Sequence, residues 1–381
     1  MTVNQVYSIL NSVASQMYGS SAIAVTNTAD FYSLGQTVSG DVDKFLGVLV
    51  DRIGKTVIRT LDVSLDFPGI MRDNFSFGAL LQKITIDPFQ AKETNSWKVG
   101  DVGFTPSLYD ISKPSVSVTY FKDVATFEFD VTIPDTLFKT AFDSESQMAA
   151  FISGIMDTME KSMTMHINFL TRGVVCGMIG EKLDLSSYVD LLTLYNNDHT
   201  PTLSADEALE SPEFLKYAGR IIRNYIEYMA NPSVLYNEGS KVRATPRDNM
   251  HVLMSTAFTS SYVTNYQSGV YWEQMVSLPY YTEVNFWQGS GDTAPTDADC
   301  TKVHVYTKNG DEVESGYVIG VLADRQAIAT GLYDRFSAAD RSNRDRFTNF
   351  TEGASLQHMV DLSENIVVFT LGAPTVTPAT P

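Results

Sequence analysis

The feature that most constrains the fold is the segment Ser144–Cys176, which repeats apolar residues at steps of three and four and contains no proline. Its apolar positions are Met148, Phe151, Ile152, Ile155, Met156, Met159, Met163, Ile167, Leu170 and Val174. This spacing places them on one face of a helix, which would be roughly 50 Å long at about 1.5 Å per residue. Because globular helices average about 11–12 residues, we expect this one to be packed along its length and to act as a strut.

The ends of this helix carry their own signals. Ser144 and Gln147 have the S-x-x-Q spacing of a capping box, in which two side chains satisfy backbone N–H groups of the first turn. Gly177 is the expected stop, because glycine adopts the left-handed conformation that ends many helices. Gly154 and Gly173 each weaken the helix slightly, which adds to its need for a packed face.

Strand patterns precede the helix. Apolar and polar residues alternate most cleanly through Phe127–Ile133, and more briefly at Ile84–Ile86 and Val116–Tyr120. Such alternation is typical of a strand with one covered face. Lys122-Asp123 is a candidate turn between the last two strands. Together these patterns predict that the chain from about Leu61 to Pro134 forms a long antiparallel β extension.

The second half of the chain mixes helix and strand signals. Ser211 as N-cap and Pro212 at the first helical position predict a helix that Asn231-Pro232 ends. A short helix is also expected to start at Asp324. Further strands are expected at His251–Met254, Thr301–Tyr306, Val313–Leu322 and Ile366–Leu371, with Asn309-Gly310 as the hairpin turn between the second and third.

The two ends of the chain have weaker patterns. Asn4–Met17 favours a short helix, whereas Ala22–Gly40 has no strong period and predicts either an extended arm or a frayed terminus. Asp41–Arg59 favours a helix that stops at Gly54, followed by a short strand. The Thr/Pro tail is polyproline-like and predicted to be disordered. The whole order indicates an α+β protein with two intertwined domains.

Charge and cysteine content exclude several classes of protein. Acidic residues outnumber basic ones 45 to 27, for a net charge of −18, which disfavours ordinary duplex nucleic-acid binding and docking on anionic membranes. Two cysteines cannot build a disulfide framework or a CxxC zinc site. The N-terminus has no signal-peptide pattern and no segment has 18 uncharged apolar residues. We therefore expect a soluble protein made in a reducing compartment.

No sequence motif predicts catalysis, a cofactor or a metal. The chain lacks a P-loop and the GxGxxG, HExxH and GxSxG patterns, and no two histidines have i,i+4 spacing. A Cys–His nucleophilic pair at Cys176 has no supporting signature, because cysteine in a buried helix usually acts as a small apolar residue. The acidic loop Asp292–Asp299 lacks the spacing of a calcium site. Arginines and aspartates are interspersed in 334–346, which fits an intersubunit salt-bridged patch and an ordinary solvated segment equally well. Phosphate binding is a third, weaker alternative.

Several short motifs resemble the Hong Kong 97-type fold of tailed-phage major capsid proteins, especially those of small short-tailed phages. Val50–Arg59 is similar to the segment that precedes the hairpin loop in that family. Leu137–Phe142 and Phe151–Ile155 are similar to the approach and the first turns of its spine helix. Val321–Ile328 with Tyr333-Asp334 is similar to its late strand and turn. The sequence departs from the family where RFTNFTEGASLQH replaces an aromatic, Trp-containing run, and at its Thr/Pro tail.

The resemblance implies a domain plan. It comprises an N-terminal arm at 1–40, the start of a peripheral domain at 41–60, an extended β-hairpin loop at 61–134, the peripheral spine helix at 135–182, an axial domain at 183–325, a return to the peripheral domain at 326–372 and the disordered tail at 373–381. It further implies a subunit that self-assembles into hexamers and pentamers of an icosahedral head, in the host cytoplasm. Scaffolding, portal and minor capsid proteins would be partners, with packaged DNA contacted only non-specifically and no membrane partner.

A projecting hairpin cannot bury its apolar face alone, so a neighbouring copy is expected to cover it. The candidate contact residues are Ile84, Ile86, Trp97, Val118, Tyr120, Phe127, Phe129, Arg341, Arg344 and Arg346. Two alternatives remain. One is another phage structural protein, such as a tail or fibre subunit, or a surface-layer protein. The other is an acidic hydrolase, which no visible nucleophile or metal set supports.

Overall fold

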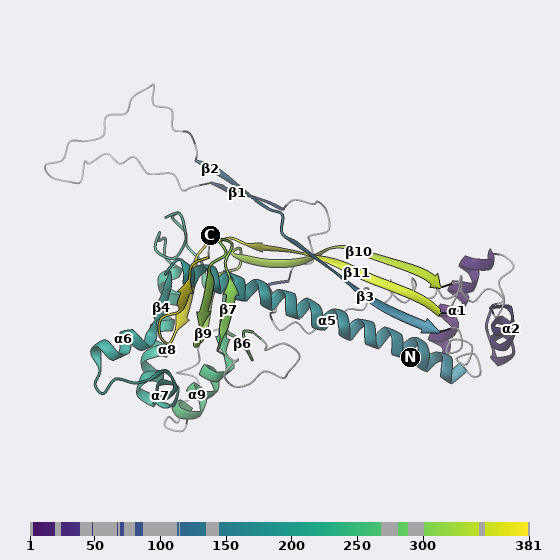
Figure 1. The fold of residues 1–381 in the computed structure, drawn as a ribbon, viewed down its shortest axis with the longest axis horizontal. Coiled ribbons are helices and arrows are strands. Elements are labelled where there is room, and N and C mark those ends of the chain that lie inside the picture. Colours follow the sequence, from purple (N-terminus) through teal and green to yellow (C-terminus); the bar gives the residue numbers. More distant parts are fainter. Residues whose placement is uncertain are drawn as a thin grey trace.

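The computed structural model describes residues 3–19, 24–38, 48, 67, 69–71, 81–86, 113, 115–134, 145–267, 281–288, 301–342 and 347–379. A single long helix, α5, runs through most of the length of the subunit (Figure 1). It spans Glu145–Asp184, or 40 residues, which is about 60 Å at about 1.5 Å per residue. The predicted strut is therefore confirmed, and it is longer than expected.

The C-terminal end of α5 differs from the prediction. The helix continues through Gly177, the expected stop, to Asp184. A Cβ atom added at Gly180 would lie 2.1 Å from Cγ2 of Val305. Glycine therefore serves here to let a strand approach the helix closely, and the prediction of an end at Gly177 is wrong.

A three-stranded sheet covers the N-terminal half of α5 (Figure 1). Its order is β10 (Ile328–Ser342), β11 (Phe347–Val360) and β3 (Val124–Pro134), all antiparallel. Met163 and Ile167 of α5 pack beneath it in an apolar cluster. The sequence predicted β3, whereas it gave no indication of the long β10–β11 pair.

A five-stranded sheet forms the other half of the body. Its order is β4 (Tyr188–Asp190), β12 (Ile366–Thr370), β9 (Val318–Asp324), β5 (Met250–Ser255) and β6 (Tyr281–Val284). Successive residues of β5, β9 and β12 point to opposite faces of the sheet and belong to two different apolar clusters. One cluster contains the C-terminal part of α5, and the other contains the helices α6 (Leu191–Asp198), α7 (Ala205–Glu210), α8 (Pro212–Met229) and α9 (Thr256–Gln267). Both faces of this sheet are therefore covered, which explains its uninterrupted apolar strands.

The helix at 212–229 follows the local signals in the sequence. The side chain of Ser211 accepts a hydrogen bond from the N–H of Phe214, and Pro212 occupies the first turn. Its buried positions, which include Phe214, Ala218 and Ile222, form the stripe that packs on the sheet. A short 3₁₀ helix at Arg247–Asn249 then leads into β5. The predicted helix and the predicted strand at His251–Met254 are confirmed.

The N-terminal forty residues are more ordered than predicted. The helix expected at Asn4–Met17 is confirmed as α1 (Val3–Tyr18), but a second helix, α2, occupies Thr28–Val38. The side chain of Asn27 accepts a hydrogen bond from the N–H of Asp30 and caps α2. The helix α1 packs against α5, and α2 belongs to the same apolar cluster as both. The prediction of an extended or frayed Ala22–Gly40 is therefore wrong for α2.

The C-terminal tail also differs from the prediction. Thr375–Thr377 forms β13, which pairs with β8 (Glu312–Ser315) in a small sheet that β7 (Val303–Tyr306) completes. The N–H of Ala379 donates to Asp311. Two prolines flank β13, and an edge strand tolerates proline because one of its sides has no partner. The prediction of a disordered tail is wrong for these residues.

Two further predictions need correction. The expected strand Val313–Leu322 is two strands, β8 and β9, which belong to different sheets and separate at Gly316. Asp324 begins a tight turn into β10 rather than a helix, since the N–H of Ala327 donates to its carbonyl oxygen and the N–H of Gln326 donates to its side chain. Aspartate favours turns and helix starts for the same reason. The helix predicted within Asp41–Arg59 lies outside the described residues, apart from Val48.

Substitutions of two α5 glycines are expected to have opposite effects. At Gly154 a Cβ atom meets nothing within 4 Å, so Gly154→Ala should raise the free energy of unfolding by about 0.5–1 kcal/mol through helix propensity. At Gly180 the Cβ atom collides with the stiff side chain of Val305, so Gly180→Ala should lower it by about 1–3 kcal/mol. Chemical denaturation of unassembled subunits measures both. Equal effects of the two variants would contradict the close approach of β7 to α5.

Candidate assembly surface

Strands β1 (Leu81–Ile86) and β2 (Val116–Phe121) form a two-stranded antiparallel ribbon. It lies apart from the sheets of the body (Figure 1). Ile84 pairs with Val118, Ile86 with Val116 and Gln82 with Tyr120. Since directly paired residues lie on the same face of a ribbon, the apolar side chains gather on one face. Polar residues, including Lys83 and Thr119, occupy the other.

The apolar face of the ribbon is the exposed one. The exposed fractions are 61% for Ile84, 56% for Ile86, 51% for Val116, 42% for Val118 and 52% for Tyr120. The polar face, which carries Lys83, Thr85, Ser117 and Thr119, is half-buried. This arrangement inverts the usual one, in which apolar side chains face the core. A contiguous exposed apolar face of this kind marks an interaction surface.

Polar contacts attach the ribbon to its own body. Nζ of Lys83 lies 2.6 Å from Oδ2 of Asp361 and 2.9 Å from Oε1 of Glu364. Nζ of Lys241 donates to Oγ of Ser117 at 2.9 Å. At the root of the ribbon, Phe121 is buried with Ala329 and Met359. These contacts fix which face of the ribbon turns outward.

The structure corrects the expectation for two of the aromatic residues. Phe127 is buried in its own subunit, where the centroid of its ring lies 4.5 Å from the centroid of the His166 ring on α5. Phe129 is partly buried in the same cluster. The strand that carries them, β3, pairs with β11 rather than with β2, so Lys122-Asp123 connects two sheets and is not a hairpin turn. The inference that a neighbour must cover the face of Phe127 and Phe129 is therefore wrong.

The other predicted contact residues differ in where the structure places them, and some lie outside the described residues. Ile84, Ile86, Val118 and Tyr120 all lie on the outward face of the ribbon. Trp97, Arg344 and Arg346 lie outside the described residues. Arg341 is in β10, where its backbone pairs with Thr348. The role of these residues in subunit contacts stays a prediction.

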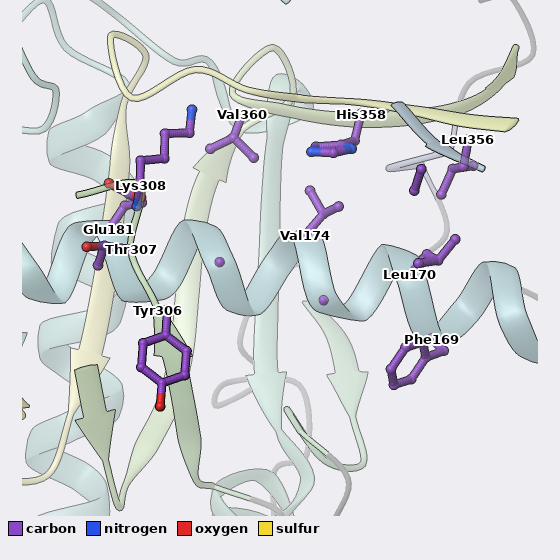
Figure 2. Close-up of a pocket in the computed structure, with 13 residues that line it drawn as sticks. Phe169, Leu170, Val174, Glu181, Tyr306, Thr307, Lys308, Leu356, His358 and Val360 are labelled. Carbon is purple, nitrogen blue, oxygen red and sulfur yellow. The ribbon is translucent and has the colours of Figure 1, made fainter. Parts of the chain in front are cut away.

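A groove beside α5 adds a second apolar surface (Figure 2). It has a volume of about 400 Å³, and α5, the end of β11 and the β7–β8 turn line it. Figure 2 shows Val174 on α5 facing His358 and Val360 across the groove, with Tyr306 and Lys308 toward one end and Phe169 toward the other. Burial lowers the pKa of His358, so this ring is uncharged at neutral pH.

Two apolar residues of α5 outside the predicted stripe are exposed, and one of them, Phe169, lines the groove. Met165 is 72% exposed and Phe169 is 67% exposed. Neither belongs to the buried stripe, and they are four residues apart on the same side of the helix. Apolar residues outside the predicted stripe were the signal that could have identified this second surface.

Cys176, which is buried, does not have the properties of a reactive thiol. Burial raises the pKa of the Cys176 thiol to about 12, and this thiol donates a hydrogen bond to the carbonyl oxygen of Trp287 at 2.9 Å. Such a thiol is inert as a nucleophile at neutral pH. In the part of the chain that the structure covers, no group of three or more histidine, cysteine, aspartate or glutamate side chains is arranged to hold a metal ion. None of the described helices is long and apolar enough to cross a membrane.

Comparison with known proteins identifies a family. A model of the Phi29-like phage major capsid protein family matches residues 8–370, which is nearly the whole chain. A search of curated proteins finds no match.

Among solved structures, one chain from "Structure of head fiber and inner core protein gp22 of native bacteriophage P68" has a TM-score of 0.50 and 11% identity, covering 81% of this chain and 85% of that one. At this identity the likeness concerns the fold alone. A chain from the capsid structure of Staphylococcus phage Andhra has a TM-score of 0.48 and 10% identity, covering 82% and 86%.

Proposed function

The chain belongs to the Phi29-like phage major capsid protein family, and we propose that its copies assemble into hexamers and pentamers of an icosahedral head that encloses double-stranded DNA. The observation that carries this proposal is the inverted ribbon, whose apolar face is exposed in the isolated subunit. An exposed face of this kind gains free energy when another copy covers it. A contact repeated head-to-tail closes into rings when its rotation closes.

We propose that the architecture is the Hong Kong 97-type capsid fold. In this assignment α1 and α2 belong to the N-terminal arm, and the ribbon is the base of the extended loop. The long helix α5 and the β10–β11–β3 sheet form the peripheral domain, and the five-stranded sheet with its helices forms the axial domain. Because β3 packs on α5 through Phe127, the extended loop in this plan ends near Phe121 instead of Pro134.

The charge of the subunit supports a limited role toward DNA. A net charge of −18 disfavours the sequence-independent binding that basic surfaces give, so contact of the shell with packaged DNA would be non-specific and weak. We propose that scaffolding, portal and minor capsid proteins act as assembly partners in the host cytoplasm.

Electron microscopy of the purified full-length protein tests the proposal. We expect closed particles or rings of megadalton mass, because many modest contacts per subunit add up in a shell. Sedimentation velocity measures the mass, and negative-stain images give the shape. Tubes would favour the tail or fibre alternative, and flat arrays would favour the surface-layer alternative. Monomers alone, at high concentration and with the partner proteins co-expressed, would refute self-assembly.

A further inference from the structure

Four charged side chains meet where the ribbon approaches the body. Nζ of Lys83 contacts Asp361 and Glu364 at 2.6 and 2.9 Å, and Nε of Arg243 lies 3.3 Å from Oε2 of Glu364. Their side chains are 6–15% exposed. Two cations and two carboxylates thus form a balanced cluster that is largely shielded from solvent. We call these four residues the ribbon latch.

The body holds the Asp361 carboxylate in place. Asp361 follows β11, and its N–H donates to the carbonyl oxygen of Ala327 at 2.8 Å. Its Oδ1 accepts a hydrogen bond from the N–H of Ser363 at 3.0 Å. Burial by itself raises the pKa of Asp361, but hydrogen bonds from Lys83 and Ser363 outweigh it and lower the pKa below its usual value. The carboxylate is therefore charged at neutral pH and ready to receive Lys83.

Among the side chains that the structure describes, the remainder of the inward face offers little apolar attachment. Lys83, Thr85, Ser117 and Thr119 face the body, and Ser117 accepts a hydrogen bond from Lys241. The buried apolar anchor, Phe121, lies at the root of the ribbon. The position of the ribbon beyond its root thus depends mainly on charged and polar contacts, which are directional. A two-stranded ribbon is marginally stable by itself.

We propose that the ribbon latch is a conformational switch, which when closed holds the ribbon on its own body with the apolar face outward and when open frees the ribbon while the body stays folded. This inference rests on the proposed function, because it concerns how the apolar face is presented to a neighbouring copy. Removal of Lys83 leaves Asp361 and Glu364 without that cation in a shielded site, which strongly disfavours the closed position. No described side chain of the ribbon belongs to the two large apolar clusters of the body, so opening leaves these clusters intact.

Hydrogen–deuterium exchange of unassembled, full-length subunits tests the switch. Lys83→Met keeps the length of the side chain and removes its charge. We expect amides of 81–86 and 116–121 to exchange at least about 10-fold faster than in wild type, since a detached ribbon opens readily. Amides of β5 and β9 should keep their wild-type rates. The matched control is Lys122→Met, because Lys122 is exposed beside the ribbon and makes no ion pair with the described residues.

A double-mutant cycle separates a latch from simple loss of stability. Asp361→Asn should also speed exchange in the ribbon, and the double variant with Lys83→Met should add little to either single one, because both break the same contact. Equal exchange in Lys83→Met and Lys122→Met would overturn the proposal. So would faster exchange spread equally over the ribbon, β5 and β9. Because the experiment uses free subunits, a failure of wild-type protein to form particles would refute the proposed function without changing this result.

Discussion

The double substitution Ile84→Asp with Val118→Asp is expected to reduce particle formation to background while the subunit stays folded. The two residues are directly paired at the centre of the exposed apolar face of the ribbon. In the isolated subunit both new carboxylates lie in water, so the free energy of unfolding should change little. In an assembly a neighbour would cover them, and an unpaired buried charge costs several kcal/mol at every copy of the contact.

Sedimentation velocity and negative-stain microscopy measure the yield of particles, and thermal unfolding followed by circular dichroism checks the fold. Lys122→Asp is the matched control, because Lys122 is exposed beside the ribbon and outside its apolar face, and the change in charge equals that of the double variant. It should assemble at nearly the wild-type yield. Normal particles from the double variant would show that a neighbouring copy does not cover this face.

The second large effect is expected within α5. Ile167 is fully buried in the cluster that joins α5 to the β10–β11–β3 sheet, so Ile167→Ala should lower the free energy of unfolding by about 2–5 kcal/mol. Met165 lies two residues away and is 72% exposed, so Met165→Ala should change it by less than about 0.5 kcal/mol. Urea denaturation of unassembled subunits measures both values. Similar losses for the two variants would mean that the faces of α5 are assigned incorrectly.

Signals that act over a few residues predicted their elements well. Ser211 and Pro212 marked the start of α8, and Asn309-Gly310 marked the turn between β7 and β8, where Gly310 has a φ of 88°. The apolar period marked α5. In each case the physical cause lies within the segment itself: a side-chain cap, a backbone conformation open to glycine, or one continuous stripe. The strand β5 was predicted from its short apolar run, although distant segments cover both of its faces.

Pairing between distant segments could not be predicted in the same way. Ile84 and Phe127 both belong to strands with alternating apolar residues, yet Ile84 is exposed and Phe127 is buried. The difference comes from β11, where Ser355 meets Thr126 across 229 residues of chain. Alternation indicates that one face of a strand is covered, but it does not identify what covers it. The ribbon latch has the same origin, because Lys83 and Asp361 are far apart in the sequence.

The path of α5 has a mechanical consequence. This helix contributes Met148 to the cluster with α1 and α2, Ile167 to the cluster under β3 and β11, and Ile179 to the cluster under the five-stranded sheet. Tension along the subunit would therefore act on the consecutive axial hydrogen bonds of one continuous helix, rather than on a weaker contact between domains. A capsid under internal pressure would then deform first at the contacts between subunits, while each subunit kept its shape.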